Sequence, residues 1–131
     1  MTKKIYLHGV ASGALAAVAC VAWCKFYEFA AYVSYPTVFG ITELIAIPVA
    51  AMILASVVYG WMEKKWKKKG EWIFHFLLTG ITLASLIGPI KMHLPDDVEM
   101  PEFFPAMVLP MHFFPALAWY TLKPMLNQST K

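Results

Sequence analysis

The stretch that decides the fold of this chain is residues 61–72, WMEKKWKKKGEW, which separates two long apolar runs. It holds five of the eleven lysines of the 131-residue chain, and the chain contains no arginine. The flanking runs, at about 38–61 and 72–90, are each close to the roughly 20 residues that an α-helix needs to cross a bilayer. A lysine-rich segment between two such runs is typical of a loop retained on the cytoplasmic side of a membrane.

Two further apolar runs, at about 5–24 and 103–122, lie on either side of this central pair. The chain is 60% hydrophobic and 15% charged, whereas about 25% of the residues in a soluble domain are charged. Too few polar residues remain to cover the outer faces of a soluble helical bundle. In lipid, helices satisfy their own backbone hydrogen bonds. The sequence therefore predicts an all-α membrane protein with four transmembrane helices in an up-down bundle, forming a single domain over residues 1–131.

The lysines are distributed unequally between the two sides that four alternating spans would define. The inner loop is predicted at 62–71, and the outer loops at 25–37 and 91–102. Only Lys25 and Lys91 fall in the outer loops. The other nine lysines are Lys3, Lys4, Lys64, Lys65, Lys67, Lys68, Lys69, Lys123 and Lys131. This bias predicts that both termini and the inner loop are cytoplasmic, in a bacterial inner membrane.

The basic character of the chain has two other interpretations. Lys3 and Lys4 before an apolar run also fit a cleaved signal peptide, but the run is longer than a signal sequence needs. The net charge of +3 is no sign of nucleic-acid binding, because the charge is sorted into one loop and arginine, the residue best suited to phosphate and base contacts, is absent. We expect no nucleic-acid partner.

Glu43 is the only carboxylate placed within a predicted span, and an unpaired charge in lipid is costly enough to suggest a function. It lies one to two turns inside the outer end of the second span. One interpretation is a cation or proton site. The alternative is a boundary carboxylate that bonds to Thr42, Lys25 or Lys91 and reaches water.

Two histidines within the spans are the other candidates for ligand or ion binding. His112 lies near the middle of the fourth span, where it would bind a ligand or metal, relay a proton, or simply bond to a neighbouring helix. His75 lies near the inner end of the third span, with Thr79 and Thr82 on the same helical face. That polar stripe would line a pathway or form interhelical hydrogen bonds. Helix-breaking Pro110 lies two residues before His112, and broken helices line binding sites in transporters.

The first span carries a stripe of small residues that predicts close helix packing. Gly9 and Gly13 let another backbone approach, and Cys20 and Cys24 extend the stripe. An alternative interpretation is that the two cysteines bind Cu(I) together with methionines. The methionines considered for that role are Met52, Met107 and Met111. Their spacing forms no known metal motif, so we predict no metal site.

No nucleophile–base pair, zinc motif or phosphate-binding loop is present in the sequence, so no enzymatic activity is predicted. The favoured hypothesis is a non-catalytic subunit, or a partner- or ligand-binding module, of a membrane assembly. The partners would be the lipid bilayer and other membrane chains, or further copies of the chain. A second hypothesis is a small oligomeric transporter or channel for a cation, proton or small solute that uses Glu43 and His112. A third is a haem- or metal-binding redox protein using His112 with His75 or His8, although the sequence identifies no cofactor.

Overall fold

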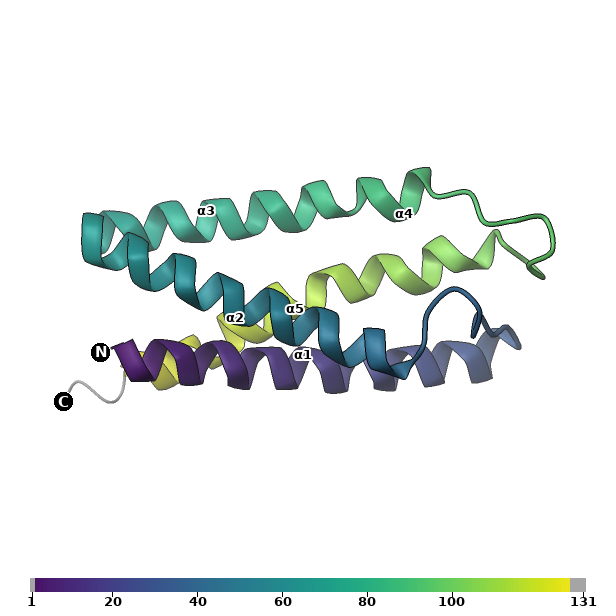
Figure 1. Cartoon of the computed structure of the whole chain (residues 1–131), viewed down its shortest axis with the longest axis horizontal. Coiled ribbons are helices and arrows are strands. Elements are labelled where there is room, and N and C mark those ends of the chain that lie inside the picture. The colour runs from purple at the N-terminus through teal and green to yellow at the C-terminus, as the bar shows by residue number, and fades with distance from the viewer. Residues whose placement is uncertain (1, 128–131) are drawn as a thin grey trace.

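The computed structural model describes residues 2–127, and within them the chain forms helices and no strands (Figure 1). Successive long helices run in alternate directions, so that the start of α1 and the end of α5 lie at the same end of the molecule (Figure 1). The helices are α1 (Thr2–Ala31), α2 (Ile41–Trp66), α3 (Lys68–Ser85), α4 (Ile87–Lys91) and α5 (Phe103–Asn127). Four helical stretches, counting α3 and α4 as one, are long and apolar enough to cross a membrane. The prediction of an all-α chain with four such helices is confirmed.

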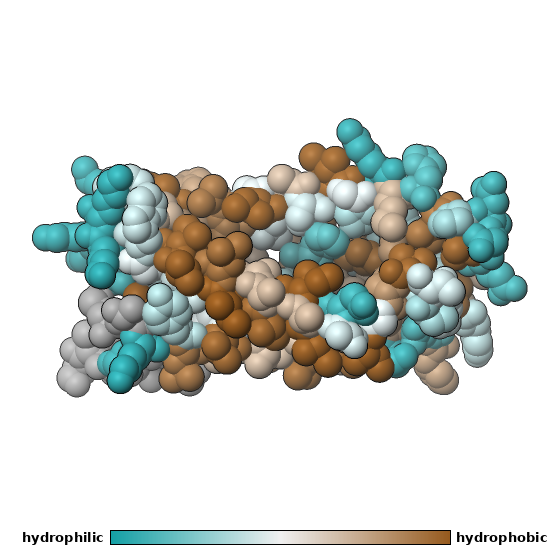
Figure 2. All heavy atoms as spheres, viewed as in Figure 1, coloured by the Kyte–Doolittle hydropathy of each residue, from teal (hydrophilic) through white to brown (hydrophobic). Residues whose placement is uncertain are grey.

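The polar and apolar residues are sorted along the long axis of the bundle. Figure 2 shows an apolar band between two hydrophilic ends. One end combines the start of α1, the α2–α3 turn and the end of α5, and it carries all the lysines predicted to be cytoplasmic except Lys131, which lies outside the described residues. The opposite end carries the acidic loop 92–102. We call these the lysine-rich end and the acidic end.

The helices extend past the predicted spans at both ends of the bundle. α1 continues through the first part of the predicted 25–37 loop as far as Ala31, where Tyr32 takes a left-handed φ of 55° and ends the helix. Lys25 and Glu28 form the ion pair that their spacing predicts, at 2.8 Å. α2 begins later than predicted, at Ile41, because residues 36–38 form a turn and residues 39–40 are irregular.

The predicted 62–71 loop is almost entirely helical in the structure. α2 continues to Trp66 and α3 begins at Lys68, so Lys67 alone, with a φ of 49°, forms the connection. Lysine is a good helix former, so a lysine-rich segment need not interrupt a helix. So tight a turn brings Gly70 against the backbone of Met62, where a Cβ would not fit. Gly70 is therefore required by close approach rather than by chain flexibility.

The small residues of α1 pack against α2 within the same chain. A Cβ added to Gly9 would lie 2.5 Å from the Cβ of Ser56, and one added to Gly13 would lie 2.9 Å from the Cα of Val49. The absence of side chains at these positions therefore lets the two helices approach closely. The face of α1 that the sequence offers for association is thus covered inside the protein.

α1 is also attached to α5 by side chains that donate to backbone carbonyls. The Trp23 indole donates to the Met107 carbonyl at 2.8 Å, and the Tyr27 hydroxyl donates to a carbonyl one turn earlier. The Cys20 thiol donates to the Met111 carbonyl at 3.9 Å. Pro115 has no N–H, so that carbonyl lacks its usual partner within the helix. These bonds fix α5 along the half of α1 that lies toward the acidic end.

The α3–α4 segment is the least covered of the four apolar stretches. Only 17% of its most apolar part is buried in the protein, against 44% for α1. Pro89 cannot donate to the Ser85 carbonyl, and the helix is interrupted between these residues, at Leu86. The buried residues of α3, which are Gly70, Phe74 and Leu78, lie in the first half of the apolar stretch Lys68–Lys91. The segment therefore presents a long outward face.

A pocket between α3 and α5

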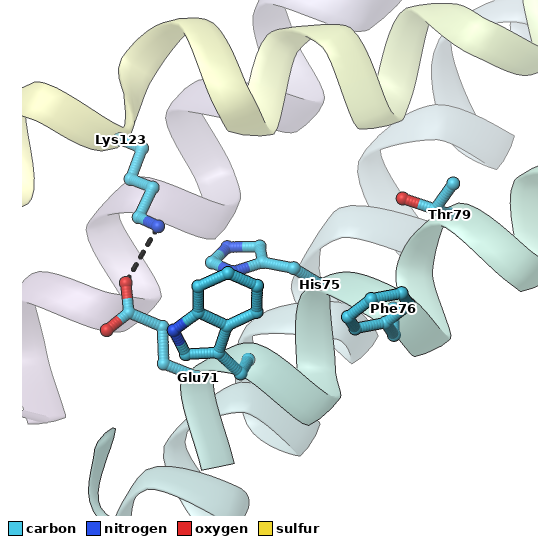
Figure 3. Close-up of a pocket in the computed structure, with 6 residues that line it drawn as sticks. Glu71, His75, Phe76, Thr79 and Lys123 are labelled. Atoms are coloured by element: carbon cyan, nitrogen blue, oxygen red, sulfur yellow. Dashed lines mark ion pairs between the residues drawn. The ribbon is translucent and has the colours of Figure 1, made fainter. Parts of the chain in front are cut away.

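A pocket of about 400 Å³ lies between α3 and α5 near the lysine-rich end (Figure 3). A volume of this size is within the range of small-molecule sites. Five of its lining residues come from α3 and one from α5. They are Glu71, Trp72, His75, Phe76, Thr79 and Lys123. Glu71, His75 and Thr79 are spaced four residues apart, which places them in one row along α3.

The outermost part of the pocket is an ion pair. Lys123 Nζ lies 2.7 Å from Glu71 Oε1, and both side chains are about one-third exposed. An ion pair this exposed to solvent contributes at most about 1 kcal/mol to stability. The lysine ammonium has three donors, so further acceptors can bind beside the carboxylate. The pair joins the first turn of α3 to the last part of α5 without closing the pocket.

Beside the pocket, a hydrogen-bonded chain joins the same two helices. The Tyr120 hydroxyl donates to the backbone carbonyl of His75 at 3.1 Å, which leaves the Thr79 hydroxyl to donate to Tyr120 at 2.9 Å. The imidazole of His75 packs on the Tyr120 ring, with centroids 5.4 Å apart. Its Nε2 is shielded from solvent and has no hydrogen-bond partner within the described residues. A buried polar atom without a partner is unusual enough to need a physical reason.

The remaining side of the pocket is aromatic and open. Trp72 and Phe76 stack with centroids 6.4 Å apart, and their side chains are 70% and 72% exposed. Figure 3 shows the ion pair at one end of the group and Thr79 at the other, with His75 between them. The pocket thus changes from charged to hydroxyl-lined along α3, with an apolar flank.

The structure brings two of the five predicted ligand- or ion-binding residues into this pocket. His75 and Thr79 line it, whereas Thr82, predicted on the same stripe, bonds back to the Leu78 carbonyl at 2.8 Å. His112 is partly buried, and its Nδ1 donates to the Val108 carbonyl of its own helix at 3.0 Å. His112 does not line the pocket.

Glu43 caps the start of α2. Its Oε2 accepts the backbone N–H of Gly40, which precedes α2, at 2.8 Å. A carboxylate in the first turn also interacts favourably with the helix dipole. The structure gives it a backbone partner in place of the side chains of Thr42, Lys25 or Lys91 that the sequence suggested. Glu43 is exposed at the acidic end.

The sulfur-containing residues considered for Cu(I) lie in two separate clusters. Cys20 and Cys24 are buried with Met107 and Met111, whereas Met52 belongs to the core at the lysine-rich half. Within residues 2–127, no three side chains of the histidine, cysteine, aspartate and glutamate types are grouped so that they could hold a metal ion. His8, considered for haem, packs edge-on against Trp119 at 4.3 Å.

Three residues around the pocket were not singled out from the sequence. Glu71 lies four residues before His75, so extending the His75 stripe by one turn would have found it. In the sequence Lys123 contributes only to the distribution of charge, and no spacing points to Tyr120. No sequence signal pairs α3 with α5, because their contact depends on how four helices are arranged in space.

No known protein family matches the chain, and neither a curated protein nor a solved structure shows significant similarity to it. Any inference about its function therefore has to be drawn from the residues of this chain and their arrangement. The pocket contains a carboxylate, an ammonium, an imidazole and a hydroxyl. The carboxylate and the ammonium pair with each other and the hydroxyl bonds to Tyr120, whereas the imidazole Nε2 has no hydrogen-bond partner within the described residues. Such an arrangement is suited to binding a ligand.

Proposed function

We propose that this chain is an integral membrane protein and a non-catalytic subunit of a larger membrane assembly, which docks on another membrane chain through the outward face of α3–α4. The observation that carries the proposal is the row formed by Gly80, Ala84 and Gly88. All three are exposed, and a Cβ added to either glycine would have nothing within 4 Å. We call this row the small-residue face.

Small residues spaced four apart are typical of interfaces between transmembrane helices, where they let two backbones approach closely. In this chain the row on α1 is already covered by α2, whereas the row on α3–α4 is uncovered. Lipid can solvate the large apolar side chains around the row, but the glycine and alanine positions themselves offer a lipid chain few atoms to contact. A second helix gains the close contact, which supports docking at this position.

The transport hypothesis has less support. It requires Glu43 and His112 to act on a shared ion or solute, yet each is engaged by its own helix or helix end. Neither lines the α3–α5 pocket. The redox hypothesis requires two histidines at one site, and of the three histidines considered only His75 lines the pocket. The role of a partner-binding subunit agrees better with these contacts than transport or redox chemistry does.

The lysine-rich end is proposed to lie in the cytoplasm, with the acidic end on the other side of the inner membrane, because lysine-rich segments are retained inside. Both native cysteines are buried, so labelling of introduced thiols should have a low background. We expect an impermeant maleimide to label Asp97→Cys in intact cells, and Lys68→Cys only after permeabilisation. Labelling of Lys68→Cys in intact cells would reverse the proposed orientation.

Docking at the small-residue face is tested by crosslinking in native membranes. A photoreactive phenylalanine at Ala84 is expected to form an adduct with a different membrane protein, because this position lies at the centre of the face. The matched control is Ala22 on α1, also a small exposed residue, which should yield lipid adducts only. Equal amounts of protein adduct from both positions, or no protein adduct from Ala84, would contradict docking at the small-residue face.

A further inference from the structure

We infer that the pocket between α3 and α5 binds an anionic phospholipid from the cytoplasmic leaflet, with the headgroup phosphate at Lys123 and an acyl chain along Trp72 and Phe76. This inference rests on the membrane placement proposed above but is independent of the docking face. It follows from the order in which charged, polar and apolar groups occur along the pocket.

The charged end of the pocket suits a phosphate. Lys123 is held by one carboxylate oxygen and keeps donors for other acceptors. The surrounding end of the molecule is strongly basic, with five lysines at positions 64–69 beside the first turn of α3. The pocket itself has no net charge, because Glu71 lies beside Lys123, so the attraction for an anionic headgroup comes from the lysines around it. Basic regions between helices on the cytoplasmic side are typical of anionic headgroup sites. A neutral or zwitterionic headgroup would gain less from this field.

The middle of the pocket suits the glycerol and ester region of a lipid. His75 lies one turn further along α3, and its shielded Nε2 has no partner in the described part of the chain. A small rotation of the ring would let this nitrogen bond an ester or phosphate oxygen. Thr79, another turn on, has a hydroxyl bonded to Tyr120 that can accept a further hydrogen bond.

The open side of the pocket suits an acyl chain. Trp72 and Phe76 are mostly exposed and stack beside the polar row, so they form an apolar strip that leads from the charged end into the apolar band. A soluble ligand would leave this strip uncovered. A volume of about 400 Å³ accommodates a headgroup and the first part of a chain, while the rest of the lipid remains in the bilayer.

The test is native mass spectrometry of the full-length protein in detergent with equal amounts of phosphatidylglycerol and phosphatidylcholine. We expect wild type to retain one phosphatidylglycerol in preference to phosphatidylcholine. Lys123→Gln should lower the bound fraction at least fivefold, whereas Lys68→Gln, which removes an exposed lysine outside the pocket, should change it less than twofold. An equal loss in both variants, or none in either, would overturn the inference.

Two further measurements keep the inference testable if Lys123→Gln does not fold. Trp72→Ala removes an exposed ring of the pocket and should also release the lipid, while Trp66→Ala, at the same end but outside the pocket, should not. Glycerol 3-phosphate, which has the phosphate chemistry of the headgroup but no acyl chains, should not displace the bound lipid. Displacement of the lipid by glycerol 3-phosphate would identify a soluble phosphate compound as the ligand and overturn the inference of a lipid site. Retention of both lipids equally would overturn the requirement for an anionic headgroup. The thiol-labelling experiment judges the membrane placement separately.

Discussion

Replacing Gly70 with alanine is expected to destabilise the protein by about 3 kcal/mol, near the upper end of the usual effect of overpacking. Gly70 lies against the Met62 carbonyl and the start of the next residue, so the clash is with backbone rather than with a side chain that can rotate away. The one-residue connection at Lys67 leaves α2 and α3 no length with which to separate. The whole helical hairpin must shift to admit a methyl group.

The matched control is the same substitution at Gly80, further along α3. A Cβ at Gly80 meets nothing within 4 Å, and alanine is favoured over glycine in a helix by up to about 1 kcal/mol. Gly80→Ala should therefore leave the stability of the isolated protein unchanged or slightly raised. The measurement is unfolding in detergent followed by circular dichroism. Similar midpoints for the two variants would show that the α2–α3 turn is looser than the structure indicates.

Much of the architecture could be predicted from the sequence because it depends on composition along the chain. Four apolar runs and a lysine-rich segment between the second and third predict the number and direction of the long helices. The helix ends were less predictable. Lysine favours a helix as well as a cytoplasmic position, so the 62–71 segment could be assigned to the correct end but not distinguished from helix.

Side-chain roles were harder to predict because a spacing does not specify a partner. Gly9 and Gly13 predict a close helix contact, yet the sequence does not say whether the other helix belongs to the same chain. Gly80, Ala84 and Gly88 show the same spacing on a segment that the structure leaves uncovered. Only the arrangement of the helices separates an internal contact from a free face.

The candidate pocket illustrates the same limit. His75 and Thr79 were identified because they are polar residues in an apolar run, which is a property of the sequence. Lys123 is distant in sequence and lies just past the predicted fourth span, so nothing local connects it with Glu71. Glu43 is a candidate in the sequence because a charge in lipid is costly. The structure places its carboxylate at the exposed start of a helix, where it accepts a hydrogen bond from a backbone N–H.

Filling the small-residue face should abolish docking without affecting the fold. In the double variant Gly80→Leu and Gly88→Leu, two large side chains project from positions where the isolated protein has open space. They would hold a partner helix away from the backbone of α3–α4 and remove the close contact on which association depends. We expect recovery of the partner to fall at least tenfold while the unfolding midpoint in detergent stays near that of wild type.

The matched control places the same change on another exposed surface. Ala14 and Ala22 are exposed on α1 and are separated by the same eight residues, so the double variant Ala14→Leu and Ala22→Leu adds similar bulk elsewhere. This variant should recover the partner at the wild-type level. A loss as large as that of the glycine variant would indicate a general effect on insertion or expression.

The most direct measurement is therefore the composition of the complex purified from native membranes at native abundance, for wild type and for the Gly80/Gly88 double variant. Docking through the small-residue face predicts that wild type is recovered with a different membrane protein in fixed stoichiometry and that the double variant is recovered without it. A wild-type protein recovered as a monodisperse monomer or homo-oligomer, or a double variant that keeps the partner, would contradict the proposed role.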